Sequence, residues 1–149
     1  MFDPSRDQAR EAFFATWRKY RAGEPLAGVE TLALDVILQH PEYHGMLSQP
    51  ERYREKDYTD ESNPFLHMSL HLALEEQLSI DQPPGIASRL QALVERHGDR
   101  HEAWHQAIEC LAETVWKSQR DGLPPDAAAY LECLSAPRSA RRRSARPPC

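Results

Sequence analysis

The chain lacks several features that would place it in a familiar class of protein. None of its apolar runs approaches the ~18–20 residues that a membrane helix needs, so we expect no membrane span. The first residues are charged from position 3 and lack the apolar segment of a secretory signal, so we expect no such signal. A glycine-rich phosphate loop, a Gly-x-Ser-x-Gly elbow and a His-Glu-x-x-His motif are also missing. Composition therefore excludes these classes without identifying a function.

Cysteine is scarce and its spacing is uninformative. The chain has three cysteines, Cys110, Cys133 and Cys149, and no Cys-x-x-Cys motif. An odd number of widely spaced cysteines is not typical of a disulfide framework. We therefore expect unpaired cysteines and a reducing, cytoplasmic location.

Positive charge is concentrated at one end of the 149 residues. Five of the 18 Lys and Arg residues lie in 138–149, which contains no acid, whereas the formal net charge of the chain is -5. The remainder carries 13 basic against 23 acidic residues, a net charge of -10, and is a poor match for a nucleic-acid backbone. We expect residues 136–149 to form a disordered arginine-rich tail, either an arm for RNA or anionic surfaces or a merely solvated end.

Apolar residues recur at helical spacing, and no stretch alternates as a strand would. We predict an all-α fold, a compact bundle of about five to six helices in a single domain over residues 1–135. Aromatic residues of the first helix are expected in the core: Phe13, Phe14, Trp17 and Tyr20. Residues 41–47 are expected to form a turn and 49–62 a polar surface loop. Capping residues, prolines and glycines place the expected helices at about 4–23, 27–40, 65–79, 86–97, 99–120 and 126–134.

The histidines follow a regular pattern. Six of the seven form pairs four residues apart, namely His40 and His44, His67 and His71, and His101 and His105. Two of these pairs continue after four more residues to a carboxylate, Glu75 in one case and Glu109 in the other. Steps of four place the three side chains of each run on one stripe of a helix, beside the apolar face.

Imidazole and carboxylate groups on inward helix faces are typical of a metal site. Without a cysteine on either stripe, these ligands favour iron, manganese or zinc. The predicted ligands are His71, Glu75, His105 and Glu109, with His44 or His67 completing the site. An open coordination position would activate water or bind a small ligand. Because imidazole must be neutral to bind a metal, affinity is expected to weaken as the pH falls.

Other interpretations of the histidines remain open. They could form a hydrogen-bond network with the glutamates in the core, or be exposed by coincidence. His40 precedes Pro41 and is expected at a helix end, and His101 falls in the first turn of its helix. In the alternative function, the histidines are structural and an apolar groove or the basic tail binds a protein partner. An RNA-associated role is favoured by the tail alone.

Several segments carry a resemblance to a known family. They are WRKYRAGEPL (17–26), ALDVILQHPEYH (33–44), NPFLHMSLHLALEEQLSIDQPPGI (63–86), DRHEAWHQAIECLAE (99–113) and QRDGLPPDAAAYLECL (119–134). Together they resemble a small proteobacterial family of uncharacterised proteins, known as domain of unknown function 1841. The resemblance covers about residues 1–135 and implies a compact, single-domain bacterial protein. It implies no activity, substrate or site residue.

Overall fold

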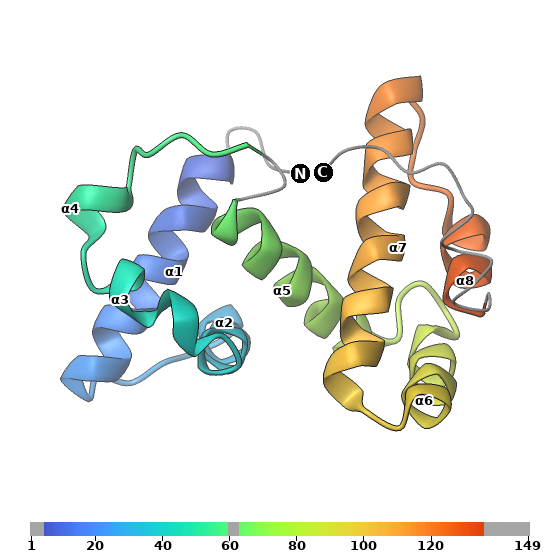
Figure 1. The fold of residues 1–149 in the computed structure, drawn as a ribbon, viewed down its shortest axis with the longest axis horizontal. Helices are drawn as coiled ribbons and strands as arrows, with labels where there is room; N and C mark the ends of the chain where they lie inside the picture. Colours follow the sequence, from blue (N-terminus) through green and yellow to red (C-terminus); the bar gives the residue numbers. More distant parts are fainter. Residues whose placement is uncertain (1–4, 60–62, 136–149) are drawn as a thin grey trace. The chain divides into compact units, whose positions relative to one another are not determined.

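A computed structural model describes residues 5–59 and 63–135, and every regular element in these ranges is helical (Figure 1). In chain order they are α1 (Ser5–Ala22), α2 (Val29–Leu38), the 3-10 turn η1 (Pro41–Tyr43), α3 (His44–Leu47), α4 (Pro50–Tyr53), α5 (Pro64–Ile80), α6 (Ile86–His97), α7 (Arg100–Asp121) and α8 (Ala127–Ser135). The all-α prediction is confirmed. The expected tail at 136–149 and the start signal at Asp3 and Pro4 lie outside the described residues.

The number of helices was underestimated. Eight α-helices occur in the described ranges instead of five to six, and the additional ones, α3 and α4, have four residues each. They lie where the sequence predicted a turn and a polar loop. Pro41 and Pro50 begin η1 and α4, where the fixed φ of proline suits a first helical turn. Elements of a single turn are too short to produce a detectable hydrophobic period.

The longer helices begin and end close to the predicted positions because local signals define their ends. The side-chain oxygen of Asn63 accepts hydrogen bonds from the backbone N–H groups of Phe65 and Leu66 at the start of α5. Asp99 caps α7 in the same way. Gly122 ends α7 in the left-handed conformation that glycine adopts without a steric penalty.

The chain divides into two compact units, Met1–Leu72 and Ala73–Cys149, with the boundary inside α5. In the first unit, α1 packs against α2, and side chains from four helices form the core. The buried residues of this core are Phe13, Phe14, Trp17, Ala33, Val36, Ile37, Leu47, Phe65 and Met68. One aromatic residue expected in the core is not there, since Tyr20 is 45% exposed near the end of α1.

In the second unit, α6, α7 and α8 pack against one another (Figure 1). Leu93 of α6, Trp104 of α7 and Leu134 of α8 are buried. Cys110 of α7 and Cys133 of α8 form a disulfide with a Cα–Cα distance of 5.8 Å, so the expectation of unpaired cysteines was wrong for these two. The two cysteines are 23 residues apart, and this spacing alone does not indicate a disulfide. The packing of α7 against α8 brings the sulfur atoms together.

Within residues 5–59 and 63–135, no helix combines the length and the hydropathy that crossing a membrane requires. This agrees with the absence of long apolar runs in the sequence.

Candidate metal centre

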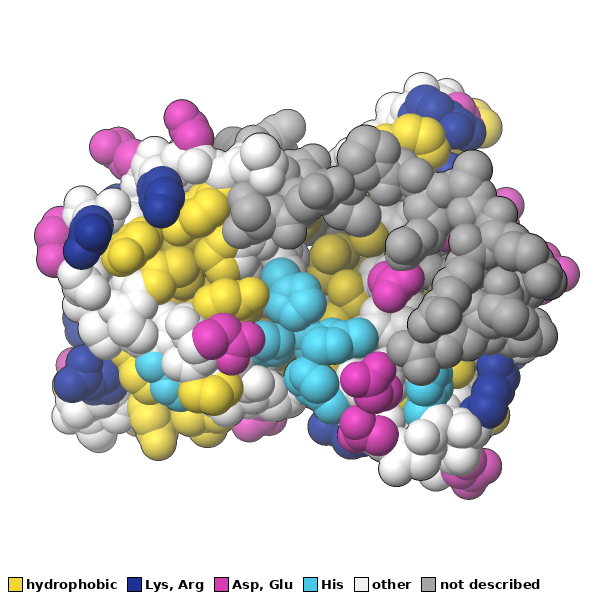
Figure 2. Space-filling view, in the orientation of Figure 1, with side chains coloured by type: hydrophobic (Ala, Val, Ile, Leu, Met, Phe, Trp, Pro, Cys, Tyr) yellow, Lys and Arg dark blue, Asp and Glu magenta, His cyan; other side chains and the backbone are white. Residues whose placement is uncertain are grey.

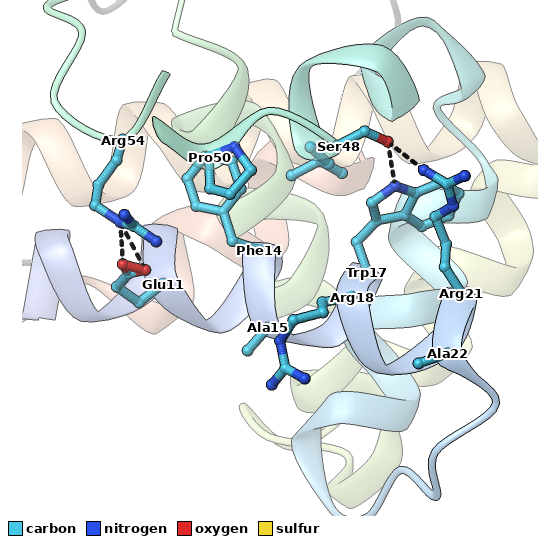
Figure 3. A pocket seen from close by; sticks show the side chains of 11 residues that line it. Glu11, Phe14, Ala15, Trp17, Arg18, Arg21, Ala22, Ser48, Pro50 and Arg54 are labelled. Carbon is cyan, nitrogen blue, oxygen red and sulfur yellow. Dashed lines mark hydrogen bonds and ion pairs between the residues drawn. The ribbon is translucent and has the colours of Figure 1, made fainter. Parts of the chain in front are cut away.

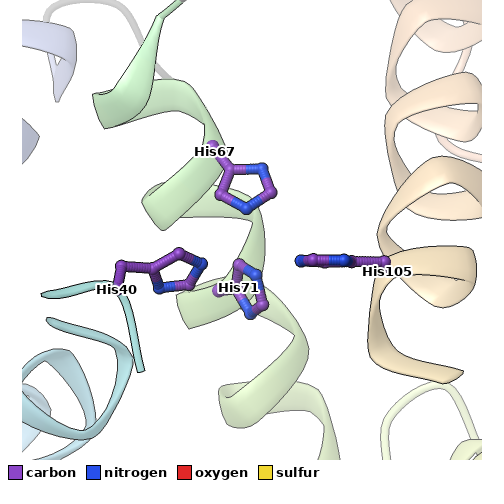
Figure 4. Close-up of side chains that lie close together, drawn as sticks. All are labelled: His40, His67, His71 and His105. Atoms are coloured by element: carbon purple, nitrogen blue, oxygen red, sulfur yellow. The ribbon is translucent and has the colours of Figure 1, made fainter. Parts of the chain in front are cut away.

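Three histidines of the first unit lie together beside the first half of α5 (Figure 4). His67 and His71 lie one turn apart on α5, and His40 follows α2. The ring centroids are 4.5 Å apart for His40 and His71, 4.7 Å for His67 and His71, and 5.0 Å for His40 and His67. Each ring offers a nitrogen within 4.8 Å of a nitrogen of the other two. We call these three residues the histidine cluster.

The backbone at His40 has left the helix, as the following proline requires. Its φ of -126° and ψ of 66° lie outside the α region, which the ring of Pro41 disfavours for the preceding residue. The imidazole is only 2% exposed, and its Nδ1 lies 2.8 Å from the carbonyl oxygen of Val36. Because a carbonyl only accepts, Nδ1 carries the hydrogen, and in a neutral ring Nε2 then holds the lone pair. This pattern is common among metal-binding histidines.

Burial differs among the members of the histidine cluster. His71 is fully buried and His67 half-buried, so the cluster extends from the interior towards the solvent. Histidine side chains are visible on the molecular surface over α5 (Figure 2). Tyr43 stacks on His40 with ring centroids 5.5 Å apart, and its burial, together with the charge of Glu42, raises the pKa of the phenol above its ordinary value. Tyr43 therefore presents a neutral aromatic ring to the cluster.

His44, a predicted ligand, has other contacts. Its Nε2 lies 2.8 Å from the carbonyl oxygen of Ile37, so this nitrogen carries the hydrogen and donates it. The ring stacks on Trp17 with centroids 4.3 Å apart. His44 does not belong to the group of neighbouring nitrogen donors, and its role as a ligand stays a prediction.

The remaining predicted ligands lie on α5 and α7. Glu75 is half-buried one turn after His71. Among the described residues, no carboxylate oxygen lies close enough to the neighbouring imidazole nitrogens to belong to their group. On α7, in the second unit, His105 is half-buried and Glu109 exposed. The ring of His105 contacts that of His101, with centroids 4.1 Å apart. A ligand role for Glu75, His105 and Glu109 stays a prediction.

The sequence did not identify His40 as a member of the site. Its position at a helix end was predicted correctly, because Pro41 follows it. The direction of its side chain depends on a core that joins α2 and α5, where Ile37 and Met68 are both fully buried. The usable signal was the pairing of His40 with His44, but this pairing does not indicate which of the two rings faces α5.

Fold and site together define an all-α protein with a partly buried histidine cluster. The chain belongs to the family described as Domain of unknown function (DUF1841), whose model matches residues 5–136. The resemblance found in the sequence is thereby confirmed. Comparison with curated proteins and with solved structures gives no match.

Proposed function

We propose that the protein binds a divalent transition-metal ion through His40, His67 and His71. The observation that carries this proposal is the mutual approach of three imidazole nitrogens to within 4.8 Å. Nitrogens bound to one tetrahedral metal at ~2.0–2.1 Å lie about 3.3 Å apart. The nitrogens therefore need to approach by no more than about 1.5 Å, which small rotations of the imidazole rings can provide.

The surroundings of the histidine cluster support metal binding. The carbonyl of Val36 fixes the ring of His40 so that Nε2 is the coordinating atom. The burial of His40 and His71 keeps bulk water away from two of the three ligands.

An all-nitrogen ligand set also bears on the identity of the metal. Imidazole suits zinc and iron, whereas manganese favours carboxylate ligands and would require Glu75 to join. We therefore expect zinc or iron. Three protein ligands leave a position for water or a small ligand, as in metal sites that activate water.

The first experiment measures the metal content of protein purified without an affinity tag. We expect about one equivalent of zinc or iron per chain, or its uptake on titration of the apoprotein. Less than about a tenth of an equivalent, with no uptake, contradicts the proposal. A bound ion at 100 times its Kd should add about 2.7 kcal/mol of stability, so a chelator should lower the melting temperature. If the histidines are only structural, the melting temperature is unchanged by the chelator.

Variants test which residues bind the ion. His67→Ala is the most informative because His67 is half-buried and its removal disturbs the core least. We expect at least a hundredfold loss of affinity, beyond the 10–100-fold typical of residues that only orient a ligand. The matched control is His97→Ala on α6, where the imidazole donates to the side-chain oxygen of Gln106. Equal affinities of the two variants would contradict the assignment. Glu75→Ala and His105→Ala test the further ligands predicted from the sequence.

A further inference from the structure

A groove of about 720 Å³ opens in the first unit between α1 and the segment that holds α3 and α4 (Figure 3). Its size falls within the range of about 300–1,000 Å³ that is usual for small-molecule sites. The apolar part of its wall consists of Phe14, Trp17, Leu47 and Pro50. Phe14 and Trp17 belong to the core, so they offer the groove a wall that is fixed in place.

The charged part of the lining is mainly basic. Arg18, Arg21 and Arg54 line the groove together with one carboxylate, Glu11. This local excess of two positive charges contrasts with the net charge of -5 of the whole chain. On the visible face of the first unit, hydrophobic side chains likewise gather next to Lys or Arg side chains (Figure 2). The groove therefore offers an apolar surface and positive charge together.

Two of the three arginines already have an acidic partner. Arg54 pairs with Glu11, and Arg18 with Glu24 at 3.4 Å. Arg21 donates to the hydroxyl of Ser48 at 3.0 Å, and it forms no ion pair with any residue that the structure describes. The same hydroxyl accepts a hydrogen bond from the indole N–H of Trp17 at 2.9 Å (Figure 3). Ser48 thus holds an exposed guanidinium next to the aromatic wall.

We propose that this groove binds a small organic carboxylate with an aromatic body. The guanidinium of Arg21 forms a forked, charge-assisted pair with the carboxylate. The aromatic body lies against Phe14 and Trp17, where ring stacking and apolar burial favour it. This binding site is separate in its residues from the histidine cluster and does not depend on the metal proposal.

The test uses a probe pair that differs only in charge, naphthalene-2-carboxylate and naphthalene-2-carboxamide. The reporter is the indole N–H resonance of Trp17 in a nitrogen-15 NMR titration, assigned by its absence in the Trp17→Phe protein. We expect the carboxylate to shift this resonance saturably and to bind about tenfold more tightly than the amide, since charge-assisted hydrogen bonds are stronger than neutral ones. Equal binding of acid and amide, or no shift up to the solubility limit, overturns the proposal.

Arginine variants complete the test. Arg21→Gln should reduce the affinity for the carboxylate about tenfold and leave the weak affinity for the amide unchanged. Arg21→Lys keeps the charge but loses the fork, so its affinity should fall between those of the wild type and Arg21→Gln. The matched control is Arg120→Gln, on α7, where the guanidinium pairs with Asp121 at 2.8 Å. Equal losses in Arg21→Gln and Arg120→Gln would mean general charge attraction and would overturn the assignment.

Discussion

The two units of the chain differ in what holds their helices in place. In the second unit, capping residues within a few positions of each end define the helices: Gly98 ends α6, Asp99 starts α7, and Asp126 accepts from the N–H of Ala129 in α8. In the first unit, the segment from His44 to Lys56 has only single helical turns. Its position depends on hydrogen bonds with side chains of α1, which lie 27 to 46 residues earlier in the chain.

Two of these long-range hydrogen bonds come from Arg10. Its side chain is 7% exposed and donates to the backbone carbonyls of Arg54 and Lys56, at 3.0 Å and 2.8 Å. The guanidinium also lies 4.7 Å from the ring centroid of Phe65. A second contact joins α1 to the segment through Arg54 and Glu11. A buried guanidinium that donates to backbone carbonyl groups therefore fastens this irregular segment to α1.

The substitution with the largest expected effect is Arg10→Ala, which would break the first unit selectively. Two hydrogen bonds to a charged group and a cation–π contact are lost, so we expect a loss of about 4 kcal/mol. Amide hydrogen exchange should accelerate in residues 50–58 and remain slow in α7. Arg52→Ala, at an exposed position of the same segment, is the control and should change stability by less than about 0.5 kcal/mol. Uniformly faster exchange in both units would contradict the claim that the contacts of Arg10 stabilise the first unit selectively.

The second unit is cross-linked by the disulfide between Cys110 and Cys133, whereas the described residues of the first unit contain no disulfide. Cys110→Ser with Cys133→Ser removes a cross-link over 23 residues and should cost about 3 kcal/mol of stability. The loss should fall on α7 and α8, as hydrogen exchange can show, with α1 and α2 unaffected. Peptide mass spectrometry without reductant should recover the two cysteines joined. If both are alkylated in the native, unreduced protein, the disulfide is absent and the expectation of unpaired cysteines is restored.

The predictability of the fold depends on whether an element is determined by local signals or by tertiary packing, and both kinds occur in each unit. The six longer helices were found from apolar spacing and from residues such as Asn63 and Gly122, whose effects are local. Single-turn elements and the disulfide were missed because tertiary packing determines them. Tyr20 was misplaced for a related reason: helical spacing defines a face, and the end of α1 extends past the core that this face covers.

The histidine cluster was predictable only in part. Spacing identified His67 and His71, since two residues four apart on one helix must share a face. It could not show that His40, and not His44, turns towards α5, because both flank the same short turn. In the folded protein, Nδ1 of His40 donates to the carbonyl oxygen of Val36, and Nε2 of His44 donates to that of Ile37. Sequence spacing contains no information about such contacts.

In the second unit, one long-range hydrogen bond of α8 supplements the local caps, and its loss should have the smallest effect of the three. Tyr130 of α8 is 2% exposed and donates to the side-chain oxygen of Gln77 at 2.8 Å. Tyr130→Phe should cost about 1 kcal/mol at neutral pH, the typical value for one neutral hydrogen bond. Urea unfolding at about pH 8 measures this loss, at a pH below the ordinary pKa of tyrosine, about 10.

Alkaline pH then separates burial of Tyr130 from its hydrogen bond. Burial holds the pKa of Tyr130 well above the ordinary value, so the folded protein keeps the proton that the unfolded chain begins to release near pH 10. A raised pKa stabilises the fold fully below the pKa of the unfolded chain, and this contribution is lost as the pH rises above it. The stability advantage of the wild type over Tyr130→Phe should therefore shrink above about pH 10. Gln77→Ala, which keeps the buried phenol, should retain the alkaline sensitivity, and if it does not, the hydrogen bond and not burial raises the pKa.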